Sequence, residues 1–393
     1  MWGFSLRFGQ IPRISFSVLV VSPMLNQTNI DSRKDKTNQV LIRLCRIVLS
    51  PSDCAFIREN SSQTDWQQLF WLACCGGVAG LVTQHLVALR FPMKVVQKFS
   101  VIGLHVGAQN KELMAETTRL CETAENGGLV LIPIKGAALN MGLPYEDLSL
   151  RAMCDLDLVT GREQIAKVEQ LLLDHGYREQ RKRAQSLLYS HHMNYVKYRG
   201  RTKVLIELHW TPFFEAYGDL KTDREIIERS QVHCHNGAKI RMLDPEDMYL
   251  SLVLHLAVHR YRSRLKWLVD LAEYCRTKEK QICWEKVWDT ARDLGGLRAA
   301  AYGTLLARDL LEAPVPNIPS FSFLPILRQF CPESMLISSR PQPSYGERFL
   351  IDFLLHDSPL SGMRQSLHKA VELLDRYWAI RLPHPIARRN PLE

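Results

Sequence analysis

The sequence contains no CxxC pair, no internal repeat and no low-complexity segment. Its ten cysteines are scattered from Cys45 to Cys331 in a chain of 393 residues. In a chain of this length, cysteines without paired spacing indicate reduced thiols in a cytosolic protein, most of them buried as small apolar side chains.

The sequence also lacks a long uninterrupted apolar run. Residues 66–89 contain no Lys, Arg, Asp or Glu, but glutamines, a histidine and three glycines interrupt them. We therefore expect a pair of buried helices there and not a membrane span. The apolar run Phe16–Val21 is shorter than a signal peptide requires. These features predict a cytoplasmic protein without a membrane segment.

The composition is that of a soluble globular protein, with 46% hydrophobic and 23% charged residues and a mean hydropathy of -0.14. It excludes collagen-like, wholly disordered and multi-span membrane chains. Fifty Lys and Arg residues against 41 Asp and Glu residues give a formal charge of +9. This excess favours anionic partners, such as nucleotides, nucleic acid or phosphorylated substrates, without choosing among them.

Hydrophobic periodicity predicts an α+β protein, in which a small core of strands and helices is flanked by N- and C-terminal helical regions. The predicted regions are 1–40 as a disordered N-terminal extension, 41–125 as a helical region, 126–212 as the α+β core, 213–312 as a second helical region, 313–345 as a Pro-rich connector and 346–393 as a C-terminal helical tail.

Four segments form the predicted sheet. Residues 129–134 and 153–159 are short apolar runs of strand length and composition. Residues 194–198 and 203–210 alternate between apolar and polar side chains around a glycine, which is typical of a hairpin.

Three carboxylates on these strands are candidate metal ligands. Because side chains alternate along a strand, Asp155 and Asp157 share the face opposite the apolar side chains, roughly 6–7 Å apart. Glu207 and His209 share the corresponding face of the later strand. If the two strands are neighbours, the three carboxylates form an oxygen-ligand cluster that suits Mg²⁺ or Mn²⁺ rather than zinc. Two such ions serve in-line displacement at a nucleotide phosphate. The alternative is an ordinary set of solvated acids.

The segment Lys135-Gly136 lies between a predicted strand and a helix. A glycine there lets backbone N–H groups approach an anion at the helix N-terminus, and the lysine supplies a positive charge. The alternative is a simple turn with a solvated lysine.

The order and spacing of these motifs resemble the uncharacterised nucleotidyltransferase family, a branch of the polymerase-beta-type nucleotidyltransferase superfamily. The matching motifs cover roughly residues 41–310 and are Lys135–Leu139, Tyr145, Arg151–Val159, Gly176-Tyr177, His192, Ile206–Trp210, Leu243–Asp247, His255, His259 and Arg264–Asp270, with Asp65-Trp66 and Leu72-Ala73 at the N-terminal side.

The resemblance implies a nucleotidyltransferase core of a small mixed sheet with helices packed on one side. It implies transfer of a nucleoside monophosphate from an NTP to an acceptor with Mg²⁺. Asp155, Asp157 and Glu207 would be the catalytic metal ligands. Lys135 and Gly136 would take the nucleotide-binding place of the superfamily's Gly-Ser turn, although no serine follows Gly136 and this turn lies farther from the acidic pair.

Several other residues leave alternatives open. Arg151 matches a family position and would contact a phosphate or pair with an acid. His255 and His259 have a spacing that binds zinc, but core or helix-face histidines are favoured. His209 flanks Glu207 on the same face and would approach the substrate, with either an indirect role through the residues that contact it or no role. Residues 178–203 carry eight Lys or Arg against one acid, so they form a solvated hairpin or attract triphosphate, RNA or an acidic partner.

The sequence thus predicts a metal-dependent nucleotidyltransferase. Its partners would be an NTP and an unidentified acceptor, for which a small molecule, a peptide or a protein is expected. A nucleic acid stays an open alternative, without an RNA-binding motif to support it. Two alternatives remain: a catalytically inactive relative that binds nucleotide or a partner, and an RNA-binding or assembly protein.

Overall fold

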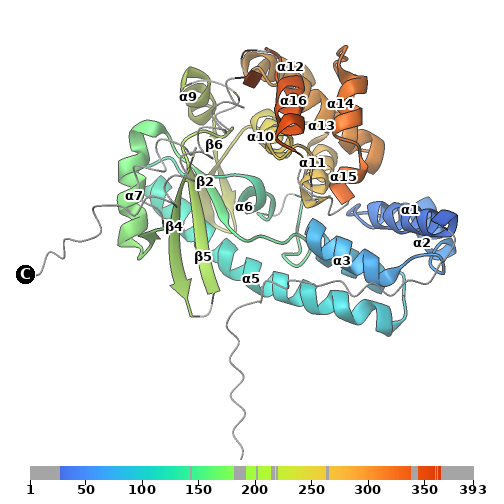
Figure 1. Ribbon diagram of the computed structural model, residues 1–393. Coiled ribbons are helices and arrows are strands. Elements are labelled where there is room, and N and C mark those ends of the chain that lie inside the picture. The colour runs from blue at the N-terminus through green and yellow to red at the C-terminus, as the bar shows by residue number, and fades with distance from the viewer. Residues whose placement is uncertain are drawn as a thin grey trace, which may run out of the picture.

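The computed structural model describes residues 27–141, 144–180, 192–200, 202–213, 217, 220–262, 265–337, 344–358, 360 and 362–363. Within these residues the protein has the predicted α+β fold. A five-stranded mixed sheet lies to one side of a large helical part built from both halves of the chain, and a separate two-stranded hairpin accompanies the sheet (Figure 1).

Five helices precede the sheet: α1 (Gln27–Arg43), α2 (Pro51–Glu59), α3 (Trp66–Gly76), α4 (Ala79–Ala88) and α5 (Met93–Asn126). The helix pair expected over residues 66–89 is confirmed as α3 and α4. Asp65 begins α3 by accepting hydrogen bonds from the backbone N–H groups of Gln67 and Gln68. Across the described part of the chain, no helix has both the length and the apolar character needed to span a bilayer.

Helix α1 corrects the expectation of disorder up to residue 40. Thr37, Val40, Leu41 and Leu44 recur at helical spacing, are buried, and pack α1 against α3. The apolar stripe begins only at Val40, so the mostly polar residues before it concealed the helix in the sequence. Residues 1–26 of the expected extension lie outside the described residues.

The sheet has the strand order β1-β2-β5-β4-β3. Its strands are β1 (Ile132–Pro133), β2 (Leu156–Val159), β3 (Arg178–Glu179), β4 (His192–Arg199) and β5 (Thr202–His209). β2 and β5 are parallel and the other neighbouring pairs are antiparallel. The short helix α6 (Lys135–Leu139) follows β1, and η1 (Arg162–Gln164) with α7 (Ile165–Asp174) follows β2. The hairpin predicted from the alternating segments is β4–β5.

Strand β2 is shorter than predicted, because side chains from helices bond the backbone that precedes it. Asn110 of α5 accepts from the N–H of Met153, and Gln109 donates to the Met153 carbonyl. Lys266 donates to the carbonyl of Ala152. These backbone groups are thereby satisfied without a neighbouring strand.

The second half of the chain is mainly helical. It contains α9 (Leu220–Glu228), α10 (Pro245–Val258), α11 (Leu265–Lys278), α12 (Trp284–Asp293), α13 (Leu297–Leu311), α14 (Leu324–Phe330), α15 (Ser334–Ile337) and α16 (Tyr345–Leu355). The hairpin β6 (Gln231–His235) and β7 (Ala238–Met242) interrupts a stretch that was predicted to be helical, and α14 and α15 lie inside the predicted connector. Residues 364–393 of the predicted tail lie outside the described residues.

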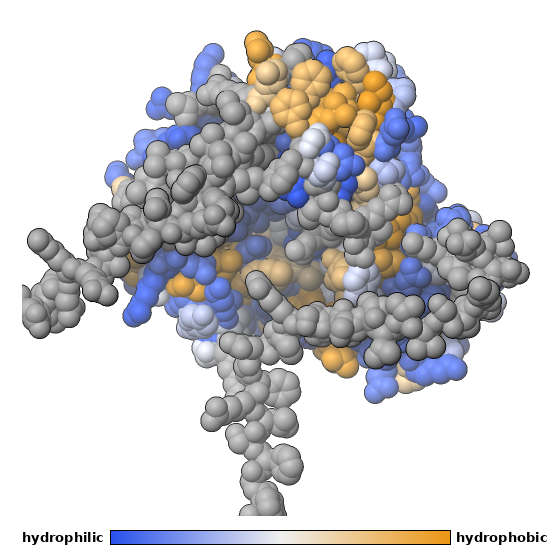
Figure 2. Space-filling model, in the orientation of Figure 1, coloured by the Kyte–Doolittle hydropathy of each residue, from blue (hydrophilic) through white to orange (hydrophobic). Residues whose placement is uncertain are grey.

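Two apolar clusters position the sheet. The larger joins the N-terminal helices to α10, α11 and α13, and the smaller joins α5 and α7 to one face of β2, β4 and β5. Apolar side chains also gather at the surface around α14 and α16, where Ile326, Phe349, Leu360 and Met363 are exposed (Figure 2). The face of the sheet opposite the smaller cluster carries the acidic residues.

Candidate active site

The two strands that carry the predicted carboxylates are neighbours. β2 and β5 run parallel, and Asp157 lies directly opposite Glu207 in their register. The leucine and isoleucine residues that alternate with these acids are buried in the smaller apolar cluster. The structure therefore places Asp157 and Glu207 side by side on one face of the sheet, as the alternation predicted.

Asp155 lies one residue before β2 and is partly exposed. Burial raises the pKa of its carboxyl, and the negative charge of Asp157 raises it further. The cationic groups of Lys266, Lys135 and Arg151 oppose this rise. The two aspartates therefore repel each other, and a bound cation would relieve that repulsion.

Asp157 is buried, and its carboxylate oxygen Oδ1 contacts two side chains. Lys135 Nζ lies 2.7 Å and His209 Nε2 lies 3.0 Å from its Oδ1. Burial alone would raise the pKa of Asp157, but the charge of Lys135 and the hydrogen bond to His209 hold it well below its usual range. Lys135 reaches this position with a φ of 50°, in the left-handed region that non-glycine residues rarely adopt.

His209 supports Asp157 more directly than Glu207, beside which it was predicted to act. Burial and the neighbouring charge of Lys135 lower the pKa of His209 to about 4, so its ring is neutral at neutral pH. Its Nε2 lies 3.8 Å from Glu207 Oε2. A neutral imidazole between two carboxylates is able to donate one hydrogen bond or to act as a metal ligand.

Arg151 pairs with an acid, which was one of its two predicted roles. Its Nε and Nη2 donate to Asp270 Oδ1 and Oδ2 at 2.8 and 2.7 Å, and Tyr145 donates to Oδ1 at 2.8 Å. All three residues are buried. Arg151 therefore ties the segment before β2 to α11, and a phosphate contact from it is not needed to explain its position.

Gly136 allows the close approach of Arg151. A Cβ at Gly136 would lie 2.2 Å from Arg151 Nη1, so a side chain there would require Arg151 to move. The Lys135-Gly136 turn thus presents its lysine to Asp157 and its glycine to Arg151. Its role in holding nucleotide phosphates stays a prediction.

The sequence reasoning missed the roles of Lys266 and Asp270, which lie one turn apart on α11. Lys266 is buried and donates to the Ala152 carbonyl at 2.9 Å. Burial lowers the pKa of Lys266 most, and the charge of Arg151 lowers it further, to about 8. The segment Arg264–Asp270 belongs to the family resemblance, but nothing in the sequence placed it against Asp155.

His255 lies on α10, and His259 directly follows the last residue of this helix. Both histidines contact Trp267 of α11. Each histidine ring lies 4.5 Å from the Trp267 ring, and the two histidine rings lie 4.7 Å apart. Burial lowers the pKa of His255 well below its usual value, and the charge of Lys135 adds to this effect. The favoured interpretation of these histidines as packed side chains agrees with these contacts, and His255 lies within electrostatic range of the acidic residues.

The basic segment is partly explained by an acid on α5. Lys197 and Arg199 lie 3.4 and 3.5 Å from the carboxylate of Glu116. Tyr177 donates to the same carboxylate at 2.7 Å. These contacts give two of the eight basic residues a structural role, whereas Arg181, Arg183 and Lys182 lie outside the described residues.

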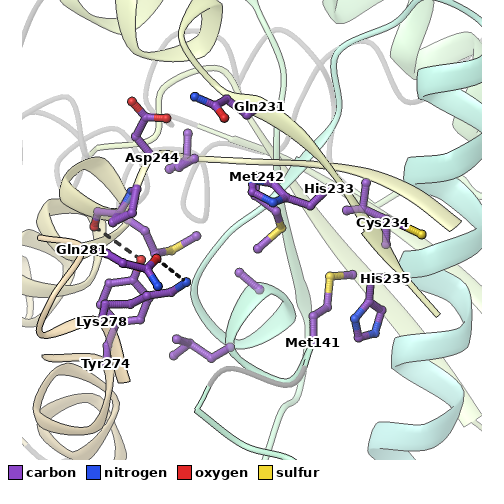
Figure 3. A pocket seen from close by; sticks show the side chains of 16 residues that line it. Met141, Gln231, His233, Cys234, His235, Met242, Asp244, Tyr274, Lys278 and Gln281 are labelled. Carbon is purple, nitrogen blue, oxygen red and sulfur yellow. Dashed lines mark hydrogen bonds between the residues drawn. The ribbon is translucent and has the colours of Figure 1, made fainter. Parts of the chain in front are cut away.

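A cavity of about 430 Å³ lies between the end of α6, the β6–β7 hairpin and helices α10 and α11 (Figure 3). Met141 and Met242 contribute to its apolar wall, while Tyr274 donates to the Pro245 carbonyl and Lys278 to Gln281 at its edge. None of the three carboxylates lines this cavity. Two helices contribute to both sites: α6 begins at Lys135, α11 carries Lys266 and Asp270, and both continue into the cavity wall.

Comparison with known proteins places the chain in a family. A model of the uncharacterised nucleotidyltransferases matches residues 62–312, well over half of the chain. The protein belongs to this nucleotidyltransferase family. The matched region contains the acidic residues, Lys135 and the two α11 residues, so this family member carries its whole candidate site within the family region.

Further comparisons add little about this nucleotidyltransferase. A solved structure described as an antigenic nucleotidyltransferase-like protein from Paracoccidioides brasiliensis is 16% identical, and the match covers 53% of this chain and 95% of that one, with a TM-score of 0.34. So loose an overlap supports no statement about the site. Among curated proteins, none matches the chain.

The donor set of this nucleotidyltransferase fits the divalent metal that is typical of such families. Two carboxylates lie opposite each other on neighbouring strands, and the third, Asp155, has a pKa raised partly by the charge of its neighbour. Oxygen donors of this kind suit Mg²⁺ or Mn²⁺. Lys135 and His209 both contact Oδ1 of Asp157.

Proposed function

We propose that the protein transfers a nucleoside monophosphate from an NTP to an acceptor, with Mg²⁺ or Mn²⁺ held by Asp155, Asp157 and Glu207. The observation that carries this proposal is the parallel pairing of β2 with β5, which sets Asp157 opposite Glu207. Asp155 lies two residues before Asp157 and within electrostatic range of it. The acceptor would be a small molecule, a peptide or a protein.

Each residue of the site then has a separate task. When bound, the metal ions supply charge neutralisation at the transferring phosphate and activate the attacking oxygen. Lys135 and Lys266 provide positive charge within electrostatic range of Asp155, which would attract an incoming triphosphate. Arg151, held by Asp270, positions the segment that carries Asp155.

The proposal predicts Mg²⁺-dependent nucleotide binding that requires the aspartates. Replacing both, as Asp155→Ala/Asp157→Ala, is expected to lower NTP affinity in the presence of Mg²⁺ at least tenfold, because the metal loses most of its ligands. Equilibrium dialysis of each labelled NTP, with and without Mg²⁺, measures this effect.

The matched control is Asp293→Ala, which removes an exposed acid at the end of α12. Asp155→Asn serves as a milder second variant, since it keeps the side-chain volume and leaves the buried Lys135–Asp157 pair intact. Equal Mg²⁺–NTP binding by the wild type and both site variants would show that the acids are not the metal ligands.

A catalytically inactive nucleotide-binding relative is the second candidate function. The ion pair between Lys135 and Asp157 favours it, because a protein cation already occupies one oxygen of the carboxylate that a metal would use. The absence of a serine after Gly136 points the same way.

A Lys135→Met variant distinguishes the two functions. If Lys135 holds nucleotide phosphates in an active site, the variant is expected to bind Mg²⁺–NTP about tenfold more weakly, the loss expected for one charge-assisted contact. Tighter binding of Mg²⁺–NTP by the variant would instead identify Lys135 as a substitute for the metal. The same dialysis assay measures both outcomes.

A further inference from the structure

Two histidines lie beside the third carboxylate on the same face of the sheet. His192 opens β4 and is paired across the strands with His209, at the end of β5. Glu207 precedes His209 by two residues, so the side chains of all three residues project from one face. The centroids of the two imidazole rings lie 5.0 Å apart.

The possible ligand atoms of these residues converge. His192 Nε2 lies 3.8 Å from Glu207 Oε1, and His209 Nε2 lies 3.8 Å from Glu207 Oε2. One ligand atom from each of the three residues lies within 4.8 Å of the other two. Bond lengths of 2.0–2.1 Å in tetrahedral geometry correspond to ligand atoms roughly 3.3–3.4 Å apart. The two pairs at 3.8 Å must therefore approach by about half an ångström, and no pair of ligand atoms must approach by more than about 1.5 Å, which rotations of the outer side chains provide.

Burial differs among the three ligands in a way that suits a reversible metal site. The His209 side chain is 2% exposed and fixed at the base, whereas those of His192 and Glu207 are 17% and 24% exposed. An ion therefore has a path from solvent to the two outer ligands, and the inner ligand is already oriented.

We propose that His192, Glu207 and His209 bind a divalent transition ion, for which Zn²⁺ is the probe, next to the oxygen-only position of Asp155 and Asp157. Two imidazoles and one carboxylate form a ligand set that zinc uses with an open fourth position. Mg²⁺ prefers oxygen ligands and octahedral geometry, so the nitrogen donors select against it.

Asn194 provides a further donor at the same place. It is the cross-strand partner of Glu207, and its buried Oδ1 has no hydrogen-bond partner among the described residues. A buried amide oxygen without a partner is costly, because its desolvation is not repaid. A cation held by Glu207 would satisfy it.

One group opposes the binding of a cation. The ammonium of Lys135 lies near the cluster, but it is bonded to Asp157 Oδ1, the same atom that His209 Nε2 contacts. The carboxylate of Asp157 thus lies between the lysine and the histidine and offsets the positive charge. Metal binding would replace the hydrogen bond between His209 and Asp157 by a bond from Nε2 to the ion.

Any catalytic use of this metal site rests on the proposed function, because Glu207 belongs to both sets of ligands. Binding of the transition ion itself requires no nucleotide. The two ideas are therefore separable by variants that remove ligands of one position only.

The experiment is calorimetric titration of the metal-free, full-length protein with Zn²⁺, without nucleotide and with Mg²⁺ at millimolar excess. We expect a Zn²⁺ site that Mg²⁺ does not displace, and at least a tenfold loss of affinity in His192→Ala. His192 is the cleaner position because it is partly exposed, while removal of the buried His209 also disturbs the fold. A His105→Ala variant, which removes an exposed histidine on α5, is the control and should bind like the wild type.

The Asp155→Asn variant tests independence from the proposed function. Retained Zn²⁺ binding together with lost Mg²⁺–NTP binding would support both. Retained Zn²⁺ binding in a wild type that never binds Mg²⁺–NTP would support the transition-metal site and reject the proposed function. Equal Zn²⁺ affinity of wild type and His192→Ala, or displacement of the ion by Mg²⁺, would overturn the inference whatever the nucleotide result.

Discussion

An Asp270→Ala variant is expected to lose about 3–5 kcal/mol of its free energy of unfolding, the usual cost of removing one partner from a buried ion pair. The Asp270 side chain is 1% exposed and accepts two hydrogen bonds from Arg151 and one from Tyr145. Without it, the guanidinium of Arg151 remains buried with its positive charge uncompensated. Urea denaturation followed by circular dichroism measures the loss.

The matched control for this prediction is a surface ion pair. Asp289 contacts Arg292 at 2.7 Å, with both side chains more than half exposed. Because solvent screens such a pair, Asp289→Ala is expected to change the free energy of unfolding by 1 kcal/mol or less. A similar effect of the two substitutions would show that the Arg151–Asp270 pair does not hold α11 to the segment before β2.

A Glu116→Gln variant is expected to lose about 2–3 kcal/mol of stability at neutral pH and much less in acid. Burial alone would raise the pKa of Glu116, but hydrogen bonds from Arg119 and Tyr177 and nearby positive charges lower it to about 2. A pKa lowered in the folded state stabilises the protein at pH values above the unfolded pKa of about 4.5. A shift of this size corresponds to about 3 kcal/mol at most.

The sign of this effect fixes its pH window. As pH falls from about 4.5 towards 2, Glu116 becomes protonated in the unfolded chain first, and its contribution to stability disappears. The difference in unfolding free energy between wild type and Glu116→Gln should therefore shrink by more than half between pH 7 and pH 3. Urea denaturation of both proteins at each pH provides the measurement.

Glu112→Gln is the control for the acid experiment. Glu112 lies one turn before Glu116 on α5, is 46% exposed and approaches Arg199 only to 3.8 Å. Its replacement is expected to change stability by a few tenths of a kcal/mol at either pH. If Glu116→Gln shows the same small, pH-independent change, the buried carboxylate does not hold β4 and Tyr177 to α5.

The acidic face was predictable because strand alternation is a local property. The apolar residues beside Asp157 and Glu207 determine which face of each strand is buried, so the acids lie on the other face. Only the adjacency of β2 and β5 had to be assumed. The α+β class followed from equally local patterns of hydrophobic periodicity.

Features that depend on contacts between distant residues were not predictable from the sequence. The partner of Arg151 lies 119 residues away on α11, and the bond from Lys266 to the Ala152 carbonyl spans 114 residues. The same contacts shortened β2, because helix side chains bond a backbone that by composition favoured a strand. Helix α1 was missed because its burial depends on α3, which its own polar residues do not reveal.

Side chains from two helices bond the backbone of the segment from Leu148 to Met153, which precedes Asp155 and Asp157. Asn110 of α5 donates to the carbonyls of Leu148 and Arg151, while Lys266 of α11 donates to that of Ala152. The position and orientation of Asp155 therefore depend on two helices from opposite halves of the chain. Relatives that keep the Asp-x-Asp pattern but have other residues at these α5 or α11 contacts are expected to place their first aspartate differently. Sequence identity at the acids alone is therefore a poor guide to shared substrates.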